Sequence, residues 1–511
     1  MAPPRSSPVD RPLRSATVAV VAATIALAPA RADAAGLYFA DRGVRPAGMA
    51  GAFVAGADDL GAVAYNPAGI YDAGTQILVD AAWLHFTSDY QRQALVRQVD
   101  PNTGRVTGEF VQSFDSAHGT SPVLPIPTLA ASLKLGKHVV VAIDAWAPYS
   151  AISSYPDTVG GKPAPTRYSL VTLDGSALAV AQAAVAFAPV KQLRIGIAAG
   201  VLAGTFRATN QMSGCVPDKF LCAPEQPEWD VLAQLSVGPI VAPSGNLGGI
   251  WAITPKWRLG AAFQLPVYVR SKAKIDVRLP STPVFERASQ QGRDADVAFD
   301  LPWTFRAGLQ MREVKDLRIE AGFGFERWSM HDAITVTTKD VTLRNIALFP
   351  ESYRVPNISF PRHFQDSFSL RLGGEYSPKV FGYDWDVRAG VSYESSAVPK
   401  QYLSVLTIDA PKVTLALGLG LHLGKLRLDA VYAHVFAIQQ TVDPAEAAIG
   451  QLSPVVANPP ARSSAINGGI YDARADVLGV GLAYTFDGPP KELVPGAETE
   501  STKPEAPPIA R

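Results

Sequence analysis

The feature that most constrains this chain is a two-residue alternation of side-chain character, which recurs from residue 75 to residue 486. In 412–423 one set of positions holds only valine and leucine, and the other holds lysine, threonine, alanine, glycine and histidine. The stretches 257–265 and 317–328 divide in the same way. Successive side chains of a β-strand point to opposite faces, so each stretch has one apolar face and one small or polar face. This is the lipid-out, lumen-in pattern of a transmembrane β-barrel, whereas the solvent face of a soluble β-sandwich rarely favours glycine.

About fourteen such stretches can be counted. They are 75–90, 125–136, 138–150, 168–188, 193–207, 230–254, 257–272, 296–312, 317–328, 364–377, 385–394, 412–423, 426–436 and 471–486. The connections between them alternate between tight turns, such as Gly136-Lys137 and Gly424-Lys425, and long loops, such as 91–124 and 329–363. We therefore predict an all-β fold, an antiparallel transmembrane barrel over residues 75–486, with periplasmic turns and outer loops.

Composition and the two ends agree with an exported membrane protein. Lys plus Arg and Asp plus Glu both total 46, which argues against nucleic acid as a partner. Residues 1–34 have a basic flank, a short apolar core and a small-residue site for cleavage after Ala34 or after Ala32, as a secretory signal peptide does. No later stretch is long and apolar enough to span as a helix. Residues 487–511 are proline-rich, charged and aperiodic, so we predict a disordered periplasmic tail.

Between the signal and the first strand lies a segment of small residues, 35–74, which we call the hatch. Its glycines recur between alanines, which favours backbone packed closely against other backbone. Asp58 and Asp59 are placed to cap a short helix that begins near Leu60, and Asn66-Pro67 ends it. We predict that the hatch is a compact plug inside the barrel, held at one depth by its last motif. The predicted gate residues are Gly48, Gly51, Asn66, Pro67, Ala68 and Gly69.

Residues 48–70, GMAGAFVAGADDLGAVAYNPAGI, resemble the hatch signature of the FadL/TodX family of outer-membrane transporters for hydrophobic compounds. The stretch 385–436, the segment IDAWAPYSAISSYP and the segment FERWSMHD are also similar to family strands. The last strand ends at Phe486, an aromatic that resembles the barrel-insertion signal. The resemblance covers nearly all of residues 35–486.

That resemblance implies passive uptake of a long-chain fatty acid or a hydrocarbon by a monomer in the bacterial outer membrane. The implied partners are the hydrophobic ligand, outer-membrane lipid and the barrel-assembly machinery. Ligand would pass from the outer loops to an apolar pocket against the hatch, and leave through a wall gap beside a kinked third strand. Pro148 is the candidate kink, although it could simply end that strand. Leu37 and Phe39 are the candidate ligand contacts. The alternative function is a structural or secretion-associated barrel whose hatch never opens.

Cys215 and Cys222 are the two cysteines of the chain. In an exported protein such a close pair most simply forms a disulfide, here in an outer loop, and two free thiols are the alternative. No further metal ligands stand near them, and the seven histidines form no evident constellation with a nucleophile and an acid. We therefore predict no catalytic residue, no metal and no cofactor.

The polar face of the alternating stretches also carries charged residues. We interpret them as a balanced ladder that ties the wall together. The sharper hypothesis is that one arginine receives the carboxylate of an acidic ligand. The residues are Arg194, Arg258, Arg306, Arg318, Glu320, Arg371, Glu375, Asp386, Arg388, Arg427 and Asp429.

Overall fold

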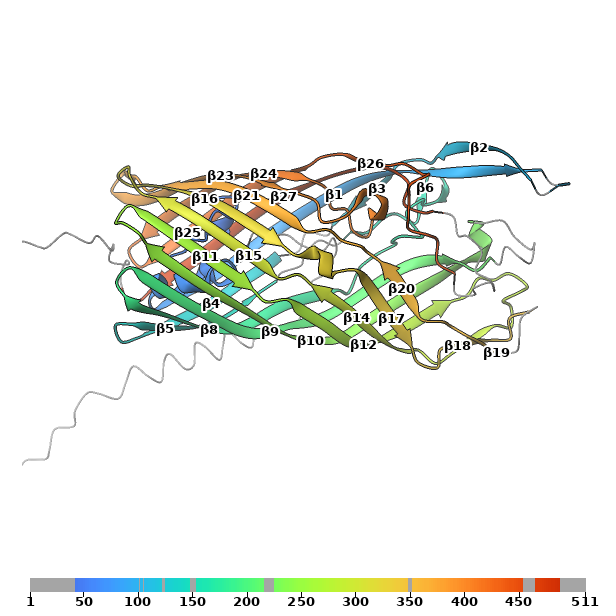
Figure 1. Ribbon diagram of the computed structural model, residues 1–511, viewed down its shortest axis with the longest axis horizontal. Helices are drawn as coiled ribbons and strands as arrows, with labels where there is room; N and C mark the ends of the chain where they lie inside the picture. The colour runs from blue at the N-terminus through green and yellow to red at the C-terminus, as the bar shows by residue number, and fades with distance from the viewer. Residues whose placement is uncertain are drawn as a thin grey trace, which may run out of the picture.

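A computed structural model describes residues 42–100, 102–103, 105–121, 125–147, 153–215, 225–347, 352–453 and 465–487. These residues form a closed barrel of fourteen antiparallel strands with the hatch inside, which confirms the predicted fold class. In Figure 1 the barrel axis is horizontal, with the short turns at the left and the long loops at the right. Closure comes from β27, which pairs with β1 from Gln76 opposite Thr485 to Arg92 opposite Gly469.

Four barrel strands are each built from two consecutive pieces. In the order of pairing, the strands are β1 (Gln76–Val99), β4 (Pro125–Leu135), β5 (Val139–Trp146), β8 (Ala177–Val190), β9 (Leu193–Ser213), β10 (Asp230–Ala252), β11 (Trp257–Gln264) with β12 (Val267–Arg278), β14 (Asp294–Leu301) with β15 (Thr304–Met311), β16 (Leu317–Glu326) with β17 (Ala333–Thr338), β20 (Ile358–Pro361) with β21 (Ser367–Tyr376), β23 (Tyr383–Glu394), β24 (Lys412–Leu423), β25 (Leu426–Ala437) and β27 (Gly469–Thr485).

Several strand boundaries differ clearly from the expectation. β1 continues to Val99 rather than ending at residue 90, and β17 and β20 lie in 329–363, which was predicted to be a loop. A strand was predicted over 168–188, but β8 begins only at Ala177. The residues before it form turns instead, with Leu170 N–H donating to Thr166 O at 2.9 Å. The alternation there was therefore not a strand signal.

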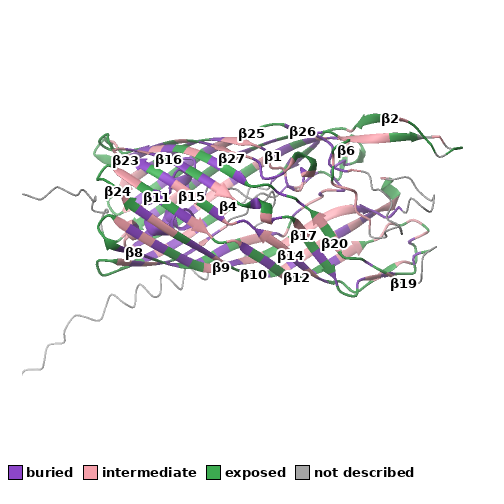
Figure 2. Ribbon diagram, in the orientation of Figure 1, coloured by how far each residue is buried: buried purple, intermediate pink, exposed green. Residues whose placement is uncertain are grey.

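The predicted two faces are clear in β24. Leu415, Leu417 and Leu419 are 51%, 63% and 51% exposed, because they lie on the outside of the barrel. Ala416 and Gly418, between them, are buried toward the lumen. Figure 2 shows the same alternation of buried and exposed positions along the strands that surround the hatch. No helix among the described residues is long and apolar enough to cross a membrane.

The outer end carries additional small elements. β1 extends past the barrel and pairs with β2 (Val106–Ser113), which lies at the far right of Figure 1. A three-stranded sheet of β13 (Ser289–Gln291), β18 (Thr342–Arg344) and β19 (Ser352–Arg354) packs on its own apolar cluster. The remaining elements are β3 (Ala117–Thr120), β6 (Thr158–Val159), β7 (Lys162–Pro163), β22 (Lys379–Val380), β26 (Gln440–Val442), η4 (Pro227–Trp229), η5 (Trp328–Met330) and η6 (Lys400–Tyr402).

The described part of the hatch contains four short helical pieces, drawn in blue inside the left half of the barrel in Figure 1. They are α2 (Val44–Ala47), η1 (Leu60–Ala64), η2 (Pro67–Gly69) and α3 (Ile70–Ala73). Nearly every hatch residue is buried, so the hatch supplies the centre of a core whose outer layer is the lumenal face of the wall.

Candidate functional site

Asn66 links the hatch segment at Val54 to the last motif of the hatch and to the wall. Its side chain is completely buried, and its Nδ2 donates to Val54 O at 2.9 Å and to Gly249 O of β10 at 3.1 Å. Its Oδ1 accepts from Ala68 N–H at 3.1 Å, which caps η2. Asp59 caps η1 in the same way by accepting from Gly61 N–H. The short polar side chains therefore satisfy the backbone donors that each helical start leaves open.

The predicted gate glycines lie where backbone passes close to other atoms. A Cβ on Gly69 would lie 2.5 Å from Ala57 O, and a Cβ on Gly48 would lie 3.1 Å from the Cα of Gly418 on β24. Gly51 adopts a φ of +72°, which side chains other than hydrogen resist. Ala68 and Pro67 pack against β9, where a Cβ on Gly196 would lie 2.3 Å from Ala68 N. There is accordingly no room for larger residues at these contacts.

An ionic network fastens the hatch segment 45–59 to the wall. Arg45 of the hatch donates to Asp58 and Asp59, both at 2.8 Å, and forms two 3.0 Å hydrogen bonds with Glu375 of β21. Arg427 of β25 donates to Asp59 at 2.5 Å. Arg45 and Asp59 are buried, so these ion pairs are exposed to little screening by water.

Wall residues also bind the hatch backbone directly. Glu320 of β16 accepts from the N–H groups of Val54, Ala55 and Gly56 at 2.6, 3.0 and 2.7 Å. Arg371 of β21 donates to Ala50 O at 2.8 Å. The interpretation of the lumenal charges as a ladder within the wall was therefore incomplete, because several of them hold the hatch.

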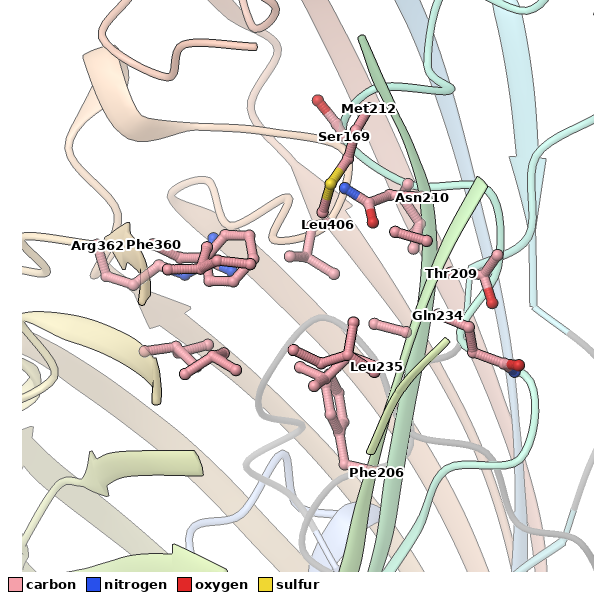
Figure 3. A pocket seen from close by; sticks show the side chains of 17 residues that line it. Ser169, Phe206, Thr209, Asn210, Met212, Gln234, Leu235, Phe360, Arg362 and Leu406 are labelled. Atoms are coloured by element: carbon pink, nitrogen blue, oxygen red, sulfur yellow. The ribbon is translucent and has the colours of Figure 1, made fainter. Parts of the chain in front are cut away.

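An apolar cavity lies above the hatch, in the outer half of the lumen. The empty space within it is about 660 Å³, which includes the solvent at its open side. Figure 3 shows that Arg362 and Phe360 lie across it from Thr209 and Gln234. The cavity is lined by Ser169, Leu170, Phe206, Ala208, Thr209, Asn210, Met212, Ala233, Gln234, Leu235, Ile275, Ile334, Val336, Ile358, Phe360, Arg362 and Leu406.

Arg362 is the one charged residue in this lining. It is 4% exposed, and its Nη1 is 3.5 Å from Thr407 Oγ1. Its Nε has no hydrogen-bond partner among the described residues, and none of their carboxylates forms an ion pair with it. Burying a guanidinium without an acid is costly, so a residue of this kind needs a reason other than stability.

Three predicted site residues, Leu37, Phe39 and Pro148, lie outside the described residues, and so does Cys222. Cys215 is disulfide-bonded and buried. Sequence reasoning missed Arg362, because it lies in 329–363, a stretch that was assigned to a loop. The signal that could have pointed to it is the apolar Ile358-Ser-Phe-Pro sequence directly before it.

Among the described residues, no group of three His, Cys, Asp or Glu side chains could hold a metal ion. The arrangement that they do present is an apolar chamber with one cation, above a fastened plug. Such a site can bind an amphiphile and can block free diffusion of water-soluble molecules.

Comparison with known proteins places this geometry in context. The sequence profile of outer membrane transport proteins of the OMPP1/FadL/TodX group matches residues 25–486. Among solved structures, a FadL homologue of Pseudomonas aeruginosa is 15% identical, with 88% of this chain and 100% of that chain covered and a TM-score of 0.64. The Pseudomonas putida toluene transporter TodX is 14% identical, with 88% and 99% covered and a TM-score of 0.57. The Ralstonia pickettii toluene transporter TbuX is 15% identical, with 87% and 99% covered and a TM-score of 0.51.

At these identities the solved structures support the fold alone. No curated protein sequence matches the chain significantly. The family match covers the whole barrel, and it places the protein in the outer membrane among transport proteins.

Proposed function

Because the chain belongs to the OMPP1/FadL/TodX family of outer membrane transport proteins, we propose that it takes up long-chain carboxylic acids across the outer membrane. Members of this family transport hydrophobic compounds. Two of the similar structures are named as toluene transporters. The substrate of this chain has to be argued from its own residues.

Arg362 is the observation that carries the choice of a carboxylic acid over a hydrocarbon. An aliphatic hydrocarbon offers nothing to a buried guanidinium and an aromatic one offers only its ring face, whereas a carboxylate offers two oxygens to its planar set of N–H donors. A bound carboxylate would also remove the cost of leaving the cation unpaired. The remaining lining is mostly aliphatic, and Phe206, Leu235 and Ile275 would cover the acyl chain.

The hatch supports transport through a closed, selective route rather than an open pore. A ligand that partitions out of water needs an apolar surface along its path, not a water-filled channel. The ligand would enter between the outer loops and settle beside Arg362. From there it would move past the fastened hatch or through the wall. A gap beside the third strand at Pro148 and contacts at Leu37 and Phe39 remain part of the proposed route.

Ligand pairs that differ only in charge test this choice. We expect purified protein to bind oleate about tenfold more tightly than oleyl alcohol, since a hydrogen bond to a charged group contributes about 1.5–3 kcal/mol. Arg362→Met should remove that difference while leaving the affinity for the alcohol unchanged. The matched control is Arg354→Met, an exposed arginine on β19. Equal affinities for oleate and oleyl alcohol in the unaltered protein would contradict a carboxylate site.

Uptake of labelled oleate into proteoliposomes separates transport from the alternative of a permanently closed barrel. We expect uptake that is faster than in protein-free vesicles and slower with Arg362→Met. Vesicles that stay sealed and accumulate no oleate would favour a structural or secretion-associated barrel.

A further inference from the structure

Three basic side chains lie together on the wall where β9, β10 and β12 run side by side, along the lower edge of the barrel in Figure 1. Arg207 of β9 and Lys274 of β12 belong to one row across the sheet, because each is opposite Ser236 of β10. Lys272 lies two residues before Lys274 on the same strand, so both side chains point to one face. We call Arg207, Lys272 and Lys274 the basic patch.

The basic patch faces away from the lumen. Its three residues are exposed, whereas Ala273 and Ile275, which alternate with the two lysines, are each 4% exposed. Ile275 and Phe206, the residue before Arg207, line the chamber at Arg362. Successive residues of a strand point to opposite faces, so the cations point outward. Strand spacing places the Cα atoms of Arg207 and Lys274 about 10 Å apart, with the hydroxyl-bearing Ser236 between them.

The height of the basic patch follows from the apolar band below it. Trp257 and Tyr268 lie on the outer face of the strand formed by β11 and β12, eleven residues apart. At about 3.3 Å per residue and a tilt of about 45°, this interval spans roughly 25 Å, the height of the band between two aromatic girdles. Lys272 and Lys274 lie about 9 and about 14 Å above Tyr268 on the same scale. Their long side chains therefore reach the head groups of the outer leaflet.

The carboxylates around the basic patch do not neutralise it. Three of them are held by other cations, in the ion pairs Arg293 with Asp276, Lys339 with Asp296, and Arg270 with Asp300. Asp294 is opposite Lys274 in the ladder but forms no ion pair with it. Within the part of the chain that the structure describes, no carboxylate forms an ion pair with Arg207, Lys272 or Lys274. The three cations are thus available to an anion from outside the protein.

The outer surface of another strand, β27, has a different charge pattern. Leu478 and Val480 are 56% and 55% exposed and mark its lipid-facing positions. The same face continues toward the outer end with Asp476 and Asp472, and Arg474 lies between them. An anionic lipid would therefore be held at the basic patch in preference to this side of the barrel.

We propose that the basic patch is a binding site for the phosphorylated glycolipid of the outer leaflet, through a phosphate of its lipid A head group. The phosphate oxygens accept hydrogen bonds from the guanidinium and the two ammonium groups, and from the Ser236 hydroxyl between them. The acyl chains of the same lipid lie below, against the exposed side chains Val241, Leu265 and Tyr268. This site lies outside the lumen and does not depend on which ligand the chamber binds.

Binding of lipid A to the purified full-length protein in a neutral detergent tests the site. The two probes are bisphosphorylated lipid A and the same lipid with both phosphates removed. We expect Lys272→Gln with Lys274→Gln to weaken binding of the bisphosphorylated lipid about thirtyfold and to leave binding of the dephosphorylated lipid unchanged. The matched control is Lys191→Gln with Lys315→Gln, which removes the same charge from exposed lysines at the turn end of the barrel. It should change neither affinity.

A second variant is expected to increase the affinity, a result that misfolding would not produce. Asp294→Asn removes the unpaired carboxylate beside Lys274 and should tighten binding of bisphosphorylated lipid A about fivefold. Inorganic phosphate at the same concentration should not displace the lipid, because it lacks the acyl chains.

Four outcomes would overturn the proposal. They are equal affinities of the unaltered protein for the two lipids, equal losses in the patch and control variants, no gain with Asp294→Asn, and displacement of the lipid by inorganic phosphate. Heat-modifiable mobility of each variant shows that its barrel is folded. If the patch variant does not fold, the comparison of the two lipids and the Asp294→Asn variant decide.

Discussion

The guanidinium of Arg427, on the wall strand β25, donates a 2.5 Å hydrogen bond to the carboxylate of Asp59 in the hatch. The same carboxylate accepts from Arg45 Nη1 at 2.8 Å. Arg427 is in turn held by Asp429, to which its Nε donates at 2.7 Å. One buried carboxylate therefore joins an arginine of the plug to an arginine of the wall.

Replacing Arg427 by methionine should loosen the hatch without unfolding the barrel. Breaking one partner out of a buried ion pair costs about 3–5 kcal/mol, and here the cost is confined to the contact between hatch and wall. We expect larger ion conductance in planar bilayers and faster proteolysis of the hatch, with unchanged heat-modifiable mobility. Arg97→Met is the control, since its ion pair with Glu109 is 54% and 44% exposed and lies on the β1–β2 hairpin. A conductance equal to that of the unaltered protein would show that Arg427 does not fasten the hatch.

Mild acid should leave the ion pairs of Asp59 with Arg45 and Arg427 intact. Burial by itself raises the pKa of the Asp59 carboxyl, but Arg45 and Arg427 hold that pKa well below its ordinary value of 3.8. A carboxyl of this kind stabilises the folded state above its unfolded pKa, and the contribution is lost as the pH falls through the folded pKa. We therefore expect the conductance difference between Arg427→Met and the unaltered protein to be the same at pH values of about 7 and about 5, and to shrink only in stronger acid, below 3.8. A smaller difference already at the milder acidity would contradict this account.

Asn66→Ala should weaken the contact between the hatch segment at Val54 and the last motif of the hatch. The change removes the donors to Val54 O and Gly249 O and the cap on Ala68 N–H. Leaving such groups unsatisfied costs about 1–3 kcal/mol each, which is too little to unfold a barrel of this size. The expected result is a leakier protein that is expressed normally, measured by antibiotic sensitivity of cells. Asn102→Ala, at the exposed turn of the outer hairpin, should have no such effect.

The features that could be predicted from the sequence are those that depend on neighbouring residues along the chain. The lipid-facing set of β24, including Leu415 and Leu417, follows from alternation, because every outward position meets the same apolar solvent. The cap at Asp59 follows as well, since it accepts from an N–H group two residues later. In both cases the physical cause lies within a few residues.

What could not be predicted depends on partners far apart in the sequence. Alternation places Glu320 in the lumen, but it cannot show that its acceptor oxygens meet Val54 N–H, 266 residues away. Stretches 230–254 and 257–272 were each predicted as one alternating strand. The bulge before Ile240 and the break at Pro266 reverse which positions face the lumen, and they depend on pairing with β9 and β15 as much as on the local residues. Arg362 was assigned to a loop for the same reason.

Gly69→Ala should displace the end of the hatch. The new methyl group would lie 2.5 Å from Ala57 O and 2.7 Å from Ala57 Cβ, and both belong to tightly packed hatch backbone. Overpacking of this kind costs about 1–3 kcal/mol. We expect the hatch to be released at a lower midpoint temperature. Limited proteolysis at increasing temperature measures this release. Gly249→Ala is the matched control, because its methyl group would meet its nearest neighbour at 3.8 Å. Equal midpoints for the two variants would show that close packing at Gly69 does not hold the hatch.

Removing residues 36–66 should leave a folded barrel that conducts small hydrophilic solutes. The wall keeps its own charge pairs, because Arg388 donates to Glu375, Asp386 and Asp429 without the hatch. Glu320 loses three backbone donors, but it would then face water in the opened lumen, which can replace them. We expect heat-modifiable mobility like that of the full chain and a much larger single-channel conductance. Arg362→Met is the control, since it alters the chamber but leaves the hatch in place. If the shortened barrel folds yet conducts no more than the intact one, another part of the chain closes the lumen.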